Sequence, residues 1–412
     1  MNPPMTLINT DPLVAHLIER ERARQFETIS LIASENYANA AICEASGSVF
    51  TNKYAEGTVG KRFYAGCEVV DELEQLAIDR CKKLFNCEYA NVQPHSGSQA
   101  NSAAYLAFLN LGDTVLAMDF AAGGHLTHGY PINLSGKLFK FVFYTVDRAT
   151  ECIDYDAVEK CALEHRPKLI IAGASAYSRT IDFERFGQIA KKVGAFLMAD
   201  IAHIAGLIAA GCHPSPIGHA DCITSTTQKT LRGPRGGFIL SQAQYATAIN
   251  RAVMPGMQGG PLMQQIAAKA VCFELAHQPA FKVYQTQVVA NAQFMAKSLE
   301  SLGYRIVAGG TDNHLFMVDL TNKGITGADA EIRLSQIGIT VNRNCIPFDT
   351  QSPMVGSGIR IGTAALTTRG MRENEVLKLT GIIHDALSQS PKKSVAILAS
   401  EVKKLACSFS PF

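Results

Sequence analysis

Short apolar runs alternate with stretches of helical periodicity through most of the chain. The runs are typical of strands buried on both faces, and they occupy residues 115–118, 169–172, 196–199 and 238–240. Between them, apolar residues recur at helical spacing over 155–164 and 185–192. Alternation of this kind predicts an α/β domain with a mostly parallel sheet.

The two ends of the chain depart from this alternation. Residues 13–21 predict a short amphipathic helix, with Asp11 as its N-cap and Pro12 at its first position. From about residue 276 a long helical stretch, 283–302, precedes mixed strands such as 315–318. We therefore expect three parts: an N-terminal helical arm (1–25), a large α/β domain (26–275) and a smaller C-terminal α+β domain (276–412).

Composition excludes several classes of protein. The chain has 412 residues, of which 47% are apolar and 18% charged, and its net charge of +2 gives no reason to expect nucleic-acid or anionic-membrane binding. No stretch reaches roughly 18 uninterrupted apolar residues, and residues 1–11 do not resemble a signal peptide. The 11 cysteines, an odd number without a Cys-x-x-Cys pair, favour reduced thiols in a cytoplasm over disulfides or a zinc ribbon.

Lys229 carries the strongest chemical signal in the chain. It lies in a polar, glycine-containing stretch (226–237) that follows the apolar run 222–224, where a strand would end at a pocket. A lysine in a pocket can form a Schiff base with an aldehyde cofactor, of which pyridoxal phosphate (PLP) is the common one. The alternative is an exposed lysine in a polar loop, the usual place for this residue type.

Asp200 directly follows the predicted strand 196–199. It therefore lies at the carboxyl end of that strand, where open α/β sheets bind their ligands. A carboxylate there could keep the ring nitrogen of PLP protonated, which makes the ring an electron sink. His203, three residues further on, could contact the phenolic oxygen of the cofactor. The alternative for Asp200 is a helix N-cap at a strand-to-helix turn.

Three further features each allow a functional and a structural interpretation. The turn Ser96–Ser98 precedes a predicted helix, 99–109, so it could hold a phosphate or simply cap that helix. His125 could stack on a pyridine ring, or be a metal ligand or a core histidine. Arg360, alone in an apolar strand bracketed by glycines, could bind a substrate carboxylate as a bidentate fork or form an internal ion pair.

Six segments, in order along the chain, resemble signatures of the serine hydroxymethyltransferase family, a fold-type I PLP-dependent group. They are Leu31–Asn36, Thr51–Gly57, Gln93–Asn101, Asp200–Leu207, Lys229–Gly237 and Gln258–Leu262, and the resemblance spans about residues 31–369. It implies an aspartate-aminotransferase-like (fold type I) large domain with PLP as cofactor. It also implies transfer of a hydroxymethyl unit between serine or glycine and tetrahydrofolate, in a homodimer whose active sites are shared between chains.

The resemblance implies a role for each matching residue around the cofactor. Lys229 would carry PLP, Asp200 would pair with the ring nitrogen, His203 with the phenolic oxygen, and His125 would stack on the ring. Other residues would hold the phosphate or line the cofactor site, those from position 54 and positions 259–260 being supplied by the partner subunit: Ser96, Gly97, Ser98, Ser175, Tyr54, Gly259 and Gly260.

The resemblance also implies residues for substrate and folate. The substrate carboxylate would be bound by Ser34 and Arg360. Glu56, from the neighbouring chain, would be the acid–base group near the hydroxymethyl carbon, with Tyr64 beside it. The pterin of the folate would be lined by Gly124, Leu126 and Asn344. No metal is expected in this site.

The chain departs from the family pattern mainly around the substrate and folate pockets. Gln228 stands where the family has histidine immediately before the lysine, and glutamine cannot change charge near neutral pH. Other departures are Thr58-Val59, Phe120, Ala122, Phe348, Gly356 and Ala364. They keep two alternatives open on the same scaffold, an α-methylserine hydroxymethyltransferase and a folate-independent aldolase of β-hydroxy amino acids. The retained set of Lys229, Asp200, Glu56 and Arg360 argues against a non-catalytic or RNA-binding relative.

Overall fold

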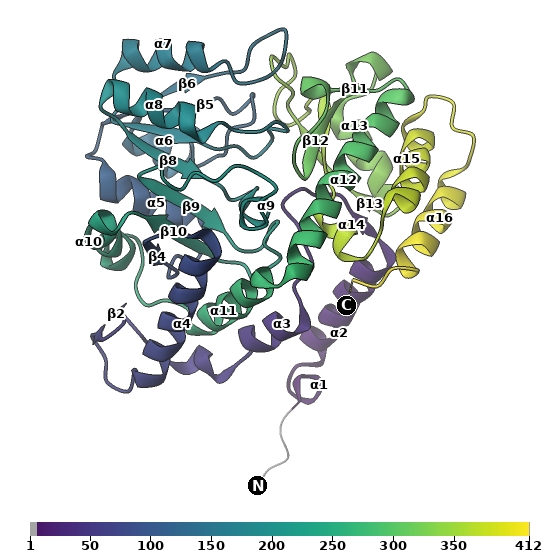
Figure 1. Ribbon diagram of the computed structural model, residues 1–412. Helices are drawn as coiled ribbons and strands as arrows, with labels where there is room; N and C mark the ends of the chain where they lie inside the picture. The colour runs from purple at the N-terminus through teal and green to yellow at the C-terminus, as the bar shows by residue number, and fades with distance from the viewer. Residues whose placement is uncertain (1–5, 412) are drawn as a thin grey trace.

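A computed structural model describes residues 6–411, which form a large α/β body with a smaller body beside it (Figure 1). The large body is built on a seven-stranded sheet. In order across the sheet its strands are β4 (Tyr89–Asn91), β10 (Gly237–Ser241), β9 (Cys222–Thr226), β8 (Phe196–Asp200), β7 (Leu169–Ala172), β5 (Thr114–Met118) and β6 (Lys140–Tyr144).

The sheet is parallel apart from one strand. Strands β5 to β9 run parallel to one another, whereas β10 is antiparallel to both of its neighbours, β4 and β9. The strands predicted at 115–118, 169–172, 196–199 and 238–240 correspond to β5, β7, β8 and β10 and are confirmed. The expected α/β body on a mostly parallel sheet is therefore present.

Helices cover both faces of this sheet because both faces are apolar. In β5, Leu116 and Met118 enter one apolar cluster while Val115 and Ala117 enter the cluster on the opposite face. The first face is covered by α4 (Glu68–Phe85), α7 (Tyr155–His165), α8 (Phe183–Val193), α9 (Ala205–Ala209) and α11 (Met263–His277). The second is covered mainly by α5 (Gly97–Phe108) and α10 (Ala246–Arg251), with α6 (Leu134–Leu138) at its edge.

The smaller body packs its own apolar cluster against an antiparallel sheet. Its strands, in order, are β11 (Arg305–Ile306), β12 (Leu315–Asp319), β15 (Gly358–Gly362) and β14 (Asn342–Asn344). Its helices are α12 (Pro279–Ser301), which runs between the two bodies in Figure 1, α13 (Gly327–Gln336), α14 (Ala364–Thr368), α15 (Glu373–Leu387) and α16 (Val395–Cys407). The predicted helix 283–302 and strand 315–318 are thereby confirmed as α12 and β12.

The segment after the N-terminal arm joins the smaller body first. Strand β1 (Ile29–Ser30) pairs in parallel with β13 (Ile339–Thr340), and Ile29 and Leu31 lie in the apolar cluster of the smaller body. We propose the expected division into arm, large domain and small domain on the basis of the separate apolar clusters, with residues 29–31 assigned to the small domain.

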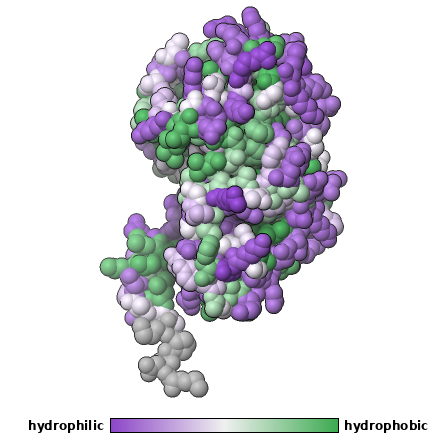
Figure 2. Space-filling view, turned by 90° about the vertical axis from the view of Figure 1, so that its left-hand side faces the viewer, coloured by the Kyte–Doolittle hydropathy of each residue, from purple (hydrophilic) through white to green (hydrophobic). Residues whose placement is uncertain are grey.

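The N-terminal arm projects from the body with its apolar side chains uncovered. Helix α1 (Leu7–Thr10) leads into α2 (Pro12–Glu27), which begins as predicted, because the Asp11 carboxylate accepts hydrogen bonds from the amides of Leu13 and Val14. None of the α2 side chains is buried, and Leu13 is 78% exposed. Figure 2 shows these hydrophobic residues gathered on the projecting segment. An apolar face of this kind is typical of a contact with another chain.

The remaining elements are short. They are α3 (Ala40–Ser46), the hairpin β2 (Gly57–Thr58) and β3 (Lys61–Arg62), and the single-turn helices η1 (Val49–Asn52), η2 (Ala243–Tyr245), η3 (Ala252–Met257), η4 (Val307–Gly309) and η5 (Thr321–Lys323). None of the helices between residues 6 and 411 combines the length and the apolar character needed to cross a bilayer.

Candidate active site

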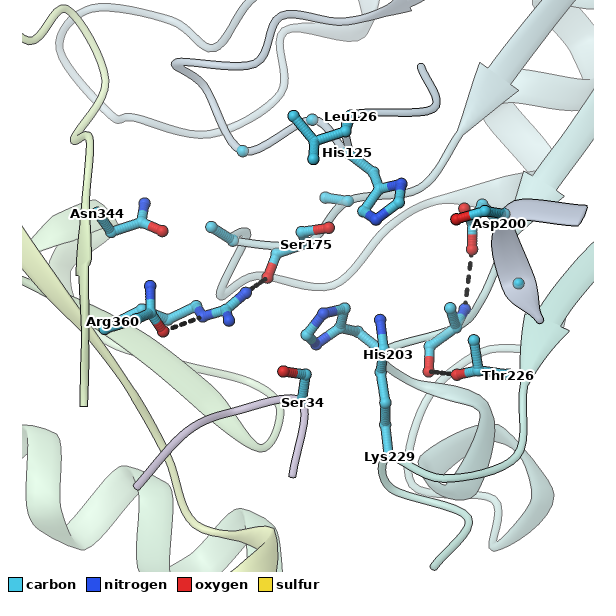
Figure 3. Close-up of a pocket in the computed structure, with 18 of the residues that line it drawn as sticks. Ser34, His125, Leu126, Ser175, Asp200, His203, Thr226, Lys229, Asn344 and Arg360 are labelled. Atoms are coloured by element: carbon cyan, nitrogen blue, oxygen red, sulfur yellow. Dashed lines mark hydrogen bonds between the residues drawn. The ribbon is translucent and has the colours of Figure 1, made fainter. Parts of the chain in front are cut away.

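A cavity of about 540 Å³ opens where the carboxyl ends of the sheet strands face the smaller body. Fourteen of the residues predicted for the site line this cavity: Ser34, Ser96, Gly97, Ser98, Gly124, His125, Leu126, Ser175, Asp200, His203, Gln228, Lys229, Asn344 and Arg360. They come from both bodies, so the cavity exists only because the two bodies pack together (Figure 3).

Lys229 extends into this cavity from the loop that follows β9. Its residue surface is only 8% exposed, so the interpretation as an exposed loop lysine is wrong. Figure 3 shows the side chain beside the His203 ring, with Arg360 on one side and Asp200 on the other. The loop is closed by backbone hydrogen bonds from the Thr227 amide to the Gly236 carbonyl (3.1 Å) and from the Gly233 amide to the Thr227 carbonyl (2.8 Å).

The surroundings of Lys229 favour its neutral, nucleophilic form more than water does. Burial lowers the pKa of Lys229 to about 8; the carboxylate of Asp200 opposes this shift, and the positive charges of Arg360 and Arg235 add to it. The amine therefore has a larger neutral fraction at neutral pH than an ordinary lysine.

Asp200 is the last residue of β8, and its carboxylate is held by two donors from elsewhere in the chain. Its Oδ2 accepts hydrogen bonds from Nε2 of His128 and from Nδ2 of Asn101, both at 2.9 Å. Burial would raise the pKa of Asp200, but the hydrogen bond and charge of His128 lower it below the ordinary value. The N-cap interpretation is wrong, because α9 begins only after Ile204 and Asp200 does not cap it.

His128 and Asn101 are site residues that the sequence-based reasoning missed. His128 is buried, and Asn101 also donates to the Thr127 hydroxyl at 2.8 Å. A signal for both was available, because His128 lies three residues after His125 and Asn101 closes the segment Gln93–Asn101. Neither residue has an apparent task until the fold brings it to Asp200.

Two imidazoles of the cavity are held in the neutral state. Burial and the neighbouring His128 lower the pKa of His125 to about 4. Burial together with the charges of Lys229 and Arg360 lowers the pKa of His203 well below its ordinary value. Gly123 and Gly124 allow the His125 loop to pack closely, because a Cβ on Gly124 would lie 2.3 Å from the Met118 carbonyl oxygen.

The turn Ser96–Ser98 begins helix α5, with Ser96 as the N-cap. The Ser96 hydroxyl accepts from the Gln99 amide at 3.2 Å. A Cβ on Gly97 would lie 2.5 Å from Cγ2 of Thr226, so this position needs glycine. The turn therefore combines helix-start amides and the positive end of the α5 dipole at the cavity, an arrangement that suits a phosphate.

Arg360 reaches the cavity from β15 and is held by neutral groups. Its Nη1 donates to the Ser175 carbonyl at 2.7 Å and its Nε to Oδ1 of Asn342 at 3.1 Å. No carboxylate within residues 6–411 forms an ion pair with it, so the internal ion pair considered from the sequence is wrong. Burial lowers the pKa of Arg360 to about 10. A partly buried cation without an anion is suited to receive one from a ligand.

A family comparison agrees with this geometry. A sequence model of the serine hydroxymethyltransferase family matches residues 7–383, which is most of the chain.

The chain belongs to the serine hydroxymethyltransferase family.

The cavity fits the PLP that serine hydroxymethyltransferases use. A buried amine, a carboxylate fixed by two donors, a neutral imidazole and a helix start converge there, at Lys229, Asp200, His125 and Ser96 respectively. Within residues 6–411 no cluster of three histidine, cysteine or acidic side chains could hold a metal ion. The metal-ligand interpretation of His125 therefore has no support in the described chain.

The remaining predicted residues gather outside the cavity. A Cβ on Gly259 would lie 3.2 Å from Oε1 of Glu56, and one on Gly260 would lie 3.7 Å from the Tyr54 ring. The rings of Tyr54 and Tyr64 pack edge to face with their centres 5.5 Å apart, and the two residues are 63% and 47% exposed. Within one chain, these five residues form a second, outward-facing patch: Tyr54, Glu56, Tyr64, Gly259 and Gly260.

Two of the departures from the serine hydroxymethyltransferase pattern, Phe120 and Gln228, lie in the wall of the cavity. Gln228 lines it, and its Oε1 accepts from the Gly236 amide at 3.3 Å. Phe120 also lines it, whereas Phe348 packs under the guanidinium of Arg148, whose central carbon lies 4.2 Å from the ring centre. The side chain of Asn344 is turned to the Cys345 carbonyl at 2.6 Å.

Proposed function

We propose that this protein transfers a hydroxymethyl unit between serine and glycine, using PLP and with tetrahydrofolate as the one-carbon acceptor. PLP-dependent hydroxymethyl transfer is the chemistry of its family. The main structural support for this proposal is that Lys229, Asp200 and Arg360 line one cavity. They bring to it an amine, a carboxylate and a cation without an ion-pair partner, respectively. When bound, PLP supplies an electron sink for the electron pair left at the amino-acid α-carbon when the Cα–Cβ bond breaks.

The chain's own residues supply attachment, charge and orientation. Lys229 would bind the aldehyde carbon and move a proton at Nζ, and Asp200 would hold the proton on the ring nitrogen. Arg360 would fix the substrate carboxylate with its free donors, assisted by Ser34. The neutral ring of His125 would lie against the pyridine, and His203 would contact its phenolic oxygen. Gly124, Leu126 and Asn344, on the cavity wall, would receive the pterin.

A shared site in a homodimer completes the proposal. Tyr54, Glu56 and Tyr64 lie outside the cavity of their own chain and are accessible to a neighbour. Glu56 of one chain would then act as the acid–base group at the substrate hydroxyl bound in the other chain, with Gly259 and Gly260 assisting at the phosphate. The exposed apolar face of α2 also supports a partner chain.

The eleven cysteines are free thiols, which supports the expected cytoplasmic location.

Substrate turnover tests the proposal. Purified protein with PLP should form glycine from serine in the presence of tetrahydrofolate, and the rate should collapse when folate is omitted. Lys229→Ala should abolish turnover, whereas Lys282→Ala, which removes an exposed lysine from α12, should not. If serine or allo-threonine is turned over at the same rate with and without folate, the result favours the aldolase instead.

Gln228 favours a second candidate, an α-methylserine hydroxymethyltransferase. Its side chain lines the cavity next to Lys229 and is anchored to Gly236, where the family has a titratable histidine. A neutral amide there changes the shape and charge of the wall near the substrate α-carbon. If this candidate is right, α-methylserine is consumed faster than serine, and Gln228→His reverses the preference. The same substrate preference in the wild type and in Gln228→His would rule out this candidate.

A further inference from the structure

Lys269 is a fully buried lysine that the proposed reaction does not use. It lies in α11, is 1% exposed, and its ammonium donates hydrogen bonds to three backbone carbonyls. The acceptors are Val92 at 2.6 Å, Pro94 at 2.9 Å and Gly237 at 2.8 Å. No carboxylate of residues 6–411 forms an ion pair with this ammonium.

Burying an ammonium group without a carboxylate partner destabilises the folded protein. Burial lowers the pKa of Lys269 to about 7, because the charged form loses its hydration there. An apolar side chain would avoid this cost. The lysine is useful only if the three carbonyls need a donor at that point, since buried carbonyls without partners are themselves destabilising.

The three carbonyls belong to the backbone that leads into the turn Ser96–Ser98. Val92 and Pro94 lie between the end of β4 and the turn, and Gly237 begins β10. The Gly237 amide also donates to the Pro94 carbonyl at 3.0 Å. The ammonium therefore links the segment that leads into the turn, through Val92 and Pro94, to Gly237 at the start of β10.

Gln258 holds the same stretch through the intervening groups. Its Nε2 donates to the Gln93 carbonyl at 3.0 Å, and its Oε1 accepts from the His95 amide at 3.3 Å. Lys269 therefore bonds to residues 92 and 94, and Gln258 bonds to residues 93 and 95. These two side chains therefore hold the backbone that leads directly into the turn.

Close packing transmits the position of Lys269 to the turn. A Cβ on Gly236 would lie 2.4 Å from Cε of Lys269, and one on Gly237 would lie 2.4 Å from the Ser96 carbonyl oxygen. The backbone of Gly236 therefore packs directly against the lysine side chain, and that of Gly237 against Ser96. The path from Lys269 to Ser96 is therefore a continuous series of contacts.

We propose that Lys269 is a positioning residue for the phosphate group of the cofactor, acting through the carbonyls of Val92, Pro94 and Gly237 on the turn Ser96–Ser98. The inference rests on the proposed function, in which that turn receives the PLP phosphate. A positioning residue differs from an ordinary core residue in one measurable way. Loss of Lys269 should weaken the binding of ligands that carry the phosphate more than that of ligands that lack it.

Equilibrium binding of PLP and of pyridoxal, which has no phosphate, to the apo protein tests the inference. Lys269→Met should weaken PLP binding by roughly tenfold or more, while pyridoxal binding changes much less. Gly236→Ala, which pushes on Cε of Lys269, should show the same selective loss and decides the question if Lys269→Met does not fold. Lys282→Met, the same replacement at an exposed position of α12, should bind both compounds as the wild type does.

The outcomes are distinguishable. An unchanged PLP affinity in folded Lys269→Met or Gly236→Ala would overturn the inference, and so would an equal loss for PLP and pyridoxal. Either result leaves the proposed function standing. Wild-type protein that binds neither compound would contradict the proposed function itself.

Discussion

Nε2 of His128 lies 2.9 Å from Oδ2 of Asp200, and the two side chains are drawn from segments 72 residues apart. The contact places a second donor beside Asn101 on the same carboxylate oxygen. Asp200 is therefore fixed in orientation before any ligand arrives, and its charge is stabilised despite burial.

Removing the His128 donor should loosen PLP. In His128→Leu, Asp200 keeps only Asn101 on Oδ2, so its pKa rises and its hold on the ring nitrogen weakens. We expect PLP affinity to fall by about tenfold or more, the cost of losing a hydrogen bond to a buried charge. His165→Leu, at the exposed end of α7, is the control. Equal PLP affinities in both variants would show that His128 does not support Asp200.

The rate of covalent PLP uptake by the apo protein should report the lowered pKa of Lys229. Only the neutral amine attacks the aldehyde, so the rate should rise with pH, reach half of its maximum near pH 8 and then level off. A lysine at the ordinary value of 10.5 would give a rate that still rises beyond pH 9. Arg235→Gln removes a neighbouring positive charge and should move the midpoint upward, because the protonated amine is then less disfavoured. A midpoint near 10 in wild-type protein would contradict the burial argument.

Replacing Arg360 should separate substrate binding from cofactor binding. Arg360→Lys keeps the charge but loses the planar fork, so the dissociation constant for serine should rise by roughly 10- to 100-fold. The dissociation constant for PLP should change little, because Arg360 contacts Ser175 and Asn342 rather than the phosphate turn. Titration of the PLP absorbance with serine measures the dissociation constant for serine, and titration of the apo protein with PLP measures the dissociation constant for PLP. Parallel losses of serine and PLP would mean that Arg360 supports the cavity as a whole.

The sheet and much of the cavity were predictable because their signals are local. Parallel strands buried on both faces are continuous apolar runs, and residues after such strands reach the ligand edge of the sheet. Asp200 ends β8 and Lys229 follows β9 in this way. The family signatures added residues whose spacing alone says little, such as Ser175 and Asn344.

Long-range pairings were not predictable from local signals. Strand β1 pairs with β13 about 310 residues later in the chain, so nothing near Ile29 indicates that it belongs to the smaller body. The partners of Asp200 come from α5 and the His125 loop for the same reason. For Arg360 the residues alone left a substrate carboxylate and an internal acid open as partners. Its neighbours are a carbonyl and an amide, which only the assembled fold reveals.

Mixed dimers should reveal a shared site. Lys229→Ala and Glu56→Gln should each be inactive alone. When the two are unfolded and refolded together, each mixed dimer should hold one site with both residues intact, and activity should return. Lys229→Ala mixed with Asp200→Ala, two changes in the same cavity, should not recover activity. Failure of the first mixture to recover activity would place Glu56 in the site of its own chain, or outside the reaction.

Borohydride reduction of the PLP-loaded protein, followed by peptide mass spectrometry, tests the central claim most directly. The account predicts one stable pyridoxyl-phosphate adduct, on the peptide that contains Lys229. An adduct on another buried lysine such as Lys269, or protein that retains no cofactor after reduction, would contradict it.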